Sequence, residues 1–82
     1  MEVVLGEEAK EELIHLPASV NARMLEVFKR LESWPAVSGA KALKGDLAGQ
    51  YRIRTGDYRI RFKVDQGRIL VLQVGHRDGF YE

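Results

Sequence analysis

Residues 51–64 read YRIRTGDYRIRFKV, a stretch in which aromatic or aliphatic side chains alternate with basic ones. Alternation with a period of two is typical of a strand that buries one face and exposes the other. Thr55-Gly56-Asp57 interrupts the pattern with a short turn, in which glycine supplies a positive φ. The stretch therefore predicts a β-hairpin with strands over 51–54 and 58–64.

The segments around the hairpin extend this sheet. After a second turn at 65–67, residues 69–74 are nearly all apolar, which predicts a third antiparallel strand covered on both faces. Before the hairpin, residues 36–50 are rich in Gly, Ala, Ser and Lys and are expected to form a loop. We expect Leu43 and Leu47 to hold this loop against the core.

The N-terminal half has helical features. Residues 1–5 suggest a short strand, and acidic residues crowd the start of a helix predicted over 7–14. Pro17 ends that helix and opens the next one. The second helix should run to about 33–34, before Pro35, and form a helical hairpin with the first. Its apolar stripe has spacings of three and four: Val20, Met24, Val27, Phe28 and Leu31.

These elements predict an α+β fold with the order β-α-α-β-β-β, in which the N-terminal strand and helical hairpin pack on an antiparallel sheet. Eighty-two residues suffice for one domain, 1–82, with one core. The chain has no cysteine, so disulfides and thiolate metal sites are excluded. Without a recognisable signal peptide or membrane-spanning stretch, a cytoplasmic location is expected and no membrane partner.

Charge is distributed unevenly along the chain. Residues 1–40 hold four Lys/Arg and seven Asp/Glu, a balance of −3, whereas residues 41–82 hold nine and five, a balance of +4. Such asymmetry points to a polyanionic partner, although a chance split is the alternative.

Most of the positive charge is predicted to share one side of the hairpin. If the apolar neighbours face the core, the opposite side carries what we call the arginine face: Arg52, Arg54, Arg59, Arg61 and Lys63. An ordinary solvated sheet surface also alternates charges, but it usually mixes their signs, because like charges across strands destabilise the sheet. Arginine's planar fork suits phosphate oxygens, so we predict that this face binds a nucleic acid.

The C-terminal residues add further candidates. Strand parity places Arg77 on the side of Gln73 and Gly75, opposite Leu70, Leu72 and Val74. If those apolar residues face the helices, Arg77 joins the arginine face. His76 then points to the helix side, where a hydrogen-bonded structural role is favoured over catalysis. Tyr81 could stack over the arginines.

The segment 43–60, L-x-G-x-L-x-G-x-Y-R-I-R-x-G-D-Y-R-I, and the ending 75–81, GHRDGFY, resemble the RelE/ParE superfamily of bacterial toxins. The resemblance covers essentially the whole chain and implies a single RelE-like toxin domain over 1–82. It is closer to the RelE branch at the ending, where Arg77 and Tyr81 match that branch's terminal arginine and tyrosine. Arg59 matches its sheet arginine.

That resemblance implies the toxin of a type II toxin–antitoxin system, which inhibits translation as a ribosome-dependent mRNA endoribonuclease. Expected partners are a cognate antitoxin, the ribosome and mRNA, with operator DNA bound only through the antitoxin. The implied chemistry needs no cofactor or metal: the ribose 2′-OH attacks the adjacent phosphate. Expected catalytic residues are Arg52, Arg54, Arg59, Arg77 and Tyr81, with RNA binding by Lys41, Lys44, Arg61 and Lys63.

Two alternatives remain at this point. The ParE branch shares the fold but poisons DNA gyrase and lacks the nuclease residues. The other alternative is a toxin-derived protein that binds antitoxin or nucleic acid but cleaves weakly or not at all. It is suggested by Arg52 and Arg54, which stand where the best-known RelE pattern has lysines. Arginine does not lose its proton, so these residues suit charge stabilisation and leave the general base unassigned.

Overall fold

The computed structural model describes residues 1–80, which contain two α-helices, five strands and two short 3-10 helices. The predicted order β-α-α-β-β-β is present, with one short strand added before the hairpin. The strands are β1 (Glu2–Leu5), β2 (Lys41–Ala42), β3 (Gln50–Thr55), β4 (Tyr58–Asp65) and β5 (Arg68–His76). The helices are α1 (Glu7–Ile14), α2 (Ala18–Leu31), η1 (Gly45–Leu47) and η2 (Arg77–Gly79).

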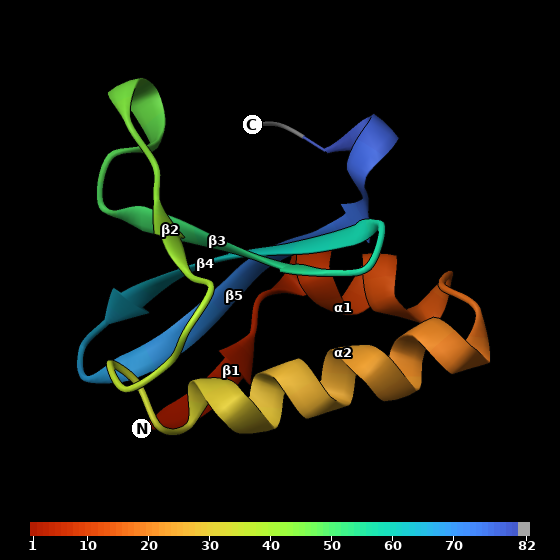
Figure 1. Ribbon diagram of the computed structural model, residues 1–82, viewed down its shortest axis with the longest axis horizontal. Coiled ribbons are helices and arrows are strands. Elements are labelled where there is room, and N and C mark those ends of the chain that lie inside the picture. Colours follow the sequence, from red (N-terminus) through yellow and green to blue (C-terminus); the bar gives the residue numbers. More distant parts are fainter. Residues whose placement is uncertain (81–82) are drawn as a thin grey trace.

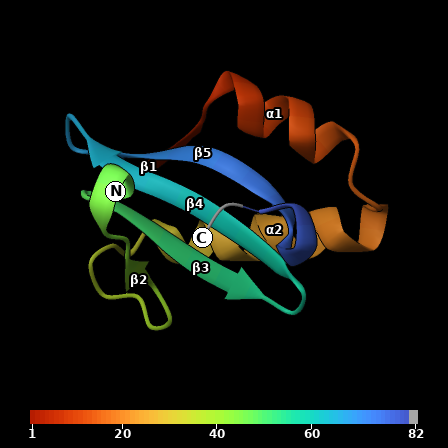
Figure 2. The same ribbon diagram turned by 90° about the horizontal axis from the view of Figure 1, so that it is seen from above.

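The strands form one sheet in the order β1-β5-β4-β3-β2. β1 runs parallel to β5, and the other neighbours are antiparallel. α2 lies under one face of the sheet and α1 runs beside β5, whereas η1 and η2 project on the other side (Figures 1 and 2). The expected α+β fold is confirmed. No helix in the described part of the chain is long and apolar enough to cross a membrane.

The helical hairpin follows the predicted local rules. α1 ends at Ile14 and α2 begins at Ala18, directly after Pro17. α2 ends at Leu31, earlier than expected, and turns continue to Pro35. The whole predicted apolar stripe of α2 is buried.

The core lies between α2 and one face of the sheet. Ile53, Ile60 and Phe62 supply the β3–β4 side and are at most 1% exposed. At one end, Phe62 stacks on Tyr51 with ring centroids 5.6 Å apart, and Trp34 meets both rings edge-on. Burial of this apolar surface supplies the main stabilisation of the fold, at about 25 cal/mol per Å².

The expected role of Leu43 and Leu47 is wrong. Both are half-buried, but Val37 and Ala40 are the residues of this segment that pack against the core. The reason is that residues 41–43 still pair with β3, since the Leu43 N–H donates to the Gln50 carbonyl at 2.9 Å. The chain then turns through η1 on the side of the sheet away from the helices (Figure 1).

A bulge in β5 overturns part of the strand-parity prediction. Gln73 and Gly75 pair with arginines of the arginine face and Val74 faces the core, as expected, but the two leucines do not face the helices. Phe62 pairs with Val71 and Arg61 with Gln73, so Leu72 is the extra residue. Val71 and Val74 therefore both face the core, although they are three residues apart. Leu70 pairs with Lys63 on the opposite face, so the leucines do not face the helices as expected. They are half-buried there, which covers the second face of β5 only in part.

Side chains of the two helices also hold the sheet at β5, beyond the end of β1, and at the β3–β4 turn. β1 is short, and beyond it the Glu12 carboxylate accepts the Val74 N–H of β5 at 2.9 Å. Under the hairpin turn, the Arg23 guanidinium donates to the Thr55 carbonyl at 2.8 Å. Gly56 has φ +60°, and a Cβ built there would lie 2.1 Å from that guanidinium. Glycine is therefore favoured at this turn by its backbone angle, whereas the nearby guanidinium is the end of a flexible side chain and can shift.

Candidate nucleic-acid interface

Strand register confirms that the arginine face exists. Arg52 pairs with Arg61, and Arg54 pairs with Arg59. Directly opposed residues of antiparallel strands point to the same side, so these four side chains share one face. Lys63 shares it through its pairing with Gln50. This is the face opposite the core, because Ile53 and Ile60, which alternate with the arginines, pair on the other side.

The β2 strand lengthens the central row of this face. Lys41 pairs with Arg52, so one row across four strands reads Lys41, Arg52, Arg61 and Gln73. The second lysine predicted to bind RNA, Lys44, is exposed at the start of η1 and belongs to no strand. The register thus brings Lys41 to the arginine face but not Lys44.

Access to solvent differs among the cations. Arg54 is exposed, and Arg59, Arg61 and Lys63 are half-buried. Arg52 is only 8% exposed. A phosphate can therefore reach Arg54 and its neighbours directly, whereas Arg52 contributes mainly the long-range field of its charge.

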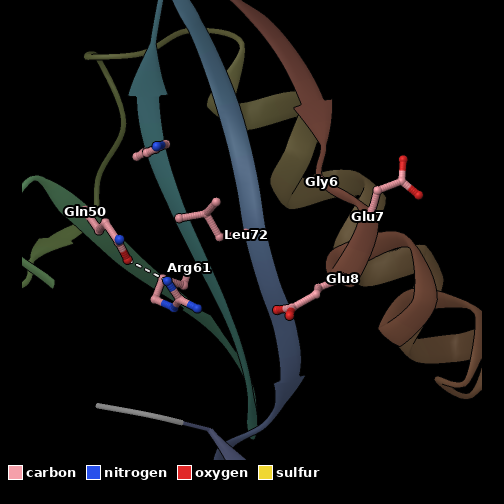
Figure 3. Close-up of a pocket in the computed structure, with 7 residues that line it drawn as sticks. Gly6, Glu7, Glu8, Gln50, Arg61 and Leu72 are labelled. Carbon is pink, nitrogen blue, oxygen red and sulfur yellow. Dashed lines mark hydrogen bonds between the residues drawn. The ribbon is translucent and has the colours of Figure 1, made fainter.

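Neutral side chains hold the guanidinium of Arg61. Its Nε donates to the Gln73 side-chain oxygen at 3.0 Å, and its Nη1 donates to that of Gln50 at 2.6 Å (Figure 3). Glutamine fixes the fork without cancelling its charge. Within residues 1–80, Arg54, Arg61 and Lys63 form no ion pair with a carboxylate. The face therefore keeps positive charge available for a ligand.

Gln50 and Gln73 were not among the predicted site residues. The available signal was the same alternation that defines the arginine face, because Gln50 precedes Arg52 by two positions. For Gln73, the β5 bulge decides which arginine lies opposite, and the sequence gives no sign of its position.

Arg77 lies just beyond the sheet, in η2. The backbone N–H of Arg77 donates to the Asp57 carbonyl at 2.8 Å. This bond holds η2 at the β3–β4 turn, next to the Arg54–Arg59 pair. The Arg77 side chain is 58% exposed, and its Nε lies 3.7 Å from a carboxylate oxygen of Asp78. The structure thus brings Arg77 to the end of the sheet that carries Arg54 and Arg59, through η2 and not through strand parity.

His76 has the hydrogen-bonded role that was expected. Its Nδ1 accepts the Asp78 N–H at 3.2 Å, and its ring meets Tyr58 edge-on with centroids 5.2 Å apart. The same Nδ1 lies 3.5 Å from a carboxylate oxygen of Asp78, so Asp78 and Tyr58 together hold the ring in place. A ring held in this way fits a structural role. Tyr81, the remaining predicted catalytic residue, lies outside the described residues.

The arrangement suits a polyanion held by cations alone. The described part of the chain has no group of three or more His, Asp or Glu side chains able to hold a metal ion. What it offers instead is guanidinium groups on two paired strands and on the adjoining η2. Guanidinium forks bind phosphate oxygens in bidentate fashion and can stabilise a phosphorane in a transition state.

Comparison with known proteins decides the family. Residues 3–79 match the family of the ParE toxin of the type II toxin–antitoxin system parDE. Toxin RelE of Mycobacterium tuberculosis is 33% identical over 82 residues, which cover 96% of this chain and 84% of that protein. The chain belongs to the RelE/ParE superfamily of type II toxins.

Solved structures of such toxins share the fold. The M. tuberculosis toxin–antitoxin complex RelBE2 contains a chain with TM-score 0.80 and 28% identity, covering 93% of this toxin and 96% of that chain. The archaeal RelE–RelB complex from Pyrococcus horikoshii gives TM-score 0.73 and 28% identity, covering 96% and 97%. The superfamily resemblance read from residues 43–60 and 75–81 is therefore confirmed.

Proposed function

We propose that this toxin is a ribosome-dependent mRNA endoribonuclease that stops translation and is restrained by a cognate antitoxin. The observation that carries the proposal is the convergence of Arg54 and Arg59, paired across β3 and β4, with Arg77 on η2 at the same end of the sheet. The similarity to Toxin RelE supports the same branch.

The proposed reaction is a transesterification. The ribose 2′-OH loses its proton and its oxygen bonds to the adjacent phosphorus, while the bond from phosphorus to the 5′ oxygen breaks. The leaving 5′ oxygen takes up a proton, so the products are a 2′,3′-cyclic phosphate and a 5′-OH. Arg54, Arg59 and Arg77 would bind the non-bridging oxygens, where negative charge accumulates in the phosphorane. Tyr81 is proposed to stack on a base or to give a proton to the leaving oxygen.

Within this scheme the remaining cations bind and orient RNA. Lys41, Lys44, Arg61 and Lys63 would bind RNA away from the cleaved bond, and Arg52 would add positive potential from its buried position. Neither the arginines nor His76 supplies a general base. The proposal therefore requires the ribosome to complete the site, and it predicts that the toxin alone does not cleave free RNA.

The proposed antitoxin would use two surfaces. The similar chain of RelBE2 belongs to a toxin–antitoxin complex, and that of P. horikoshii belongs to a RelE–RelB complex. Here an acidic antitoxin segment would cover the arginine face, and a helix would pack on exposed helix surface. A shallow apolar hollow of about 300 Å³ between α1 and α2 suits the helix, since its walls include Ile14, 73% exposed, and Leu25, 61% exposed.

The test is cleavage of mRNA on programmed ribosomes, with and without antitoxin. We expect wild-type toxin to cut message within the A-site codon and antitoxin to prevent it. Arg77→Ala should lower cleavage by about 100-fold or more, since removal of one preorganised charge stabiliser has effects of this order. Lys29→Ala on α2 removes the same charge from the helix side and should cleave normally.

Two outcomes would overturn the proposal. The match to the ParE toxin family favours a gyrase inhibitor as the second candidate. Inhibited supercoiling by purified gyrase, with mRNA intact, would establish that function instead. Salt-dependent binding of RNA or ribosomes without any cut would instead show a binding protein that lacks the nuclease activity.

A further inference from the structure

A shallow pocket opens beside the arginine face, between the sheet and the start of α1. It has a volume of about 330 Å³. Its sheet side carries Gln50, Arg61 and Lys63, its floor includes Leu72, and its far wall is the segment Gly6–Glu8. The proposed cleavage chemistry does not use this pocket, although Arg61 and Lys63 on its sheet side are among the residues proposed to bind RNA. Volumes near this size are typical of small-ligand sites in which a few polar groups fix orientation.

The two polar walls of the pocket have opposite hydrogen-bonding character. Arg61 has five N–H donors, of which the bonds to Gln73 and Gln50 use two, so three remain for a ligand. Across Leu72, the Glu8 carboxylate turns toward β5 (Figure 3). Among the residues that the structure describes, Glu8 makes no ion pair, so its oxygens remain available as acceptors.

We propose that this pocket binds one guanine base of an RNA whose phosphates lie on the arginine face. Guanine carries two adjacent acceptors, O6 and N7, which match an arginine fork. Its Watson–Crick edge carries two adjacent donors, N1–H and N2–H, which match a carboxylate. The exposed bases of single-stranded RNA offer both edges at once. Leu72 provides an apolar surface for the ring, and Lys63 lies close enough to contact a flanking phosphate.

The other three bases fit less well. The Watson–Crick edges of adenine and cytosine each place an acceptor next to the amino donor, and that of uracil places carbonyls on both sides of its N–H. Each would bring an acceptor against the Glu8 carboxylate and lose one of the two hydrogen bonds. A good bidentate pair discriminates by about 1–3 kcal/mol, which corresponds to roughly fivefold to 150-fold in affinity.

The Glu7 side chain supplies a matched control. Glu7 and Glu8 are neighbours of the same type, but the Glu7 carboxylate points away from the pocket (Figure 3). The Glu7 side chain is 95% exposed and lies 3.7 Å from the Lys10 ammonium. Glu7→Gln and Glu8→Gln therefore change the net charge equally, one residue apart, and only the second changes an acceptor in the pocket.

The experiment measures binding of the toxin alone to four fluorescent RNA hexamers of uridine, with G, A, C or U at one central position, at one fixed salt concentration. We expect the guanine hexamer to bind the wild type on the order of tenfold more tightly than the others. Glu8→Gln should abolish this preference, and Glu7→Gln should keep it while shifting all four affinities alike. Circular dichroism confirms that both variants are folded.

Equal binding of all four hexamers by the wild type, or equal effects of the two variants, would overturn the guanine pocket. This inference builds on the proposed function, yet the two fail separately. A guanine preference that needs Glu8, together with uncut mRNA on ribosomes, would remove the nuclease and keep the pocket. Cleavage with no change of base preference in Glu8→Gln would do the reverse.

Discussion

The two faces of the β3–β4 hairpin are built from alternating residues of the same strands, and they differ in almost every physical property. On the face against α2, Ile53, Ile60 and Phe62 are almost completely buried. On the other, arginine stands opposite arginine in two successive pairs. Like charges directly across strands cost stability. The comparison teaches that one face holds the toxin together, while the other keeps a repulsive arrangement useful for binding a polyanion.

The strongest test of the core face is Phe62→Ala. Phe62 is fully buried and packs against Trp34 and Tyr51, so its truncation should lower the free energy of unfolding by about 3–5 kcal/mol. A domain of this length has about 4–12 kcal/mol in all, so the variant should be partly unfolded. Urea denaturation followed by circular dichroism measures the change. Val64→Ala, on the same strand at 39% exposure, should cost less than about 1 kcal/mol, and equal losses would contradict this division.

A smaller effect is expected where α1 completes the sheet edge. Glu12→Ala leaves the half-covered Val74 N–H without its acceptor and should lower the free energy of unfolding by about 1–3 kcal/mol. Glu11→Ala is the control, since Glu11 is the exposed neighbour of the same type. Protection of the Val74 amide from hydrogen exchange should fall in the first variant only. Unchanged exchange would show that α1 does not secure this edge.

The smallest effect on stability, and of opposite sign, is expected on the arginine face. Arg54→Ala removes the charge opposite Arg59 and should leave the free energy of unfolding unchanged or raise it by about 0.2–1 kcal/mol. The same variant should weaken RNA binding and reduce the salt dependence of log Kd by about one phosphate contact. Salt titration of RNA binding and urea denaturation measure the two quantities. A loss of more than about 1 kcal/mol would show that Arg54 stabilises the fold.

Local patterns were sufficient for most of the architecture. The period of two over 51–64 determines the hairpin, and the spacing of Val20, Met24 and Val27 determines the buried side of α2. These predictions succeeded because each depends only on residues that are a few positions apart in the sequence. The arginine face was predictable for the same reason, since it follows from the alternation that buries Ile53 and Ile60.

Two predictions that depended on longer-range geometry failed. The bulge at Leu72 depends on how β5 fits between β4 and β1, so strand parity assigned Leu70 and Leu72 to the wrong face. Leu43 and Leu47 are apolar enough for a core, but the pairing of residues 41–43 with β3 carries them to the other side. The apolar character of these residues does not by itself tell which face of the sheet they occupy.

By itself, the sequence determined the order of elements, the burial of one hairpin face and the concentration of arginine on the other, because alternation and helical spacing are local properties. Only the tertiary structure decided which groups surround each cation. It placed the side chains of Gln50 and Gln73 against Arg61 and brought η2 to the turn beside Arg54. It also placed Glu8 and Arg61 around one pocket that Leu72 lines. These contacts join residues far apart in the chain, and their geometry depends on the strand register and on a single bulge.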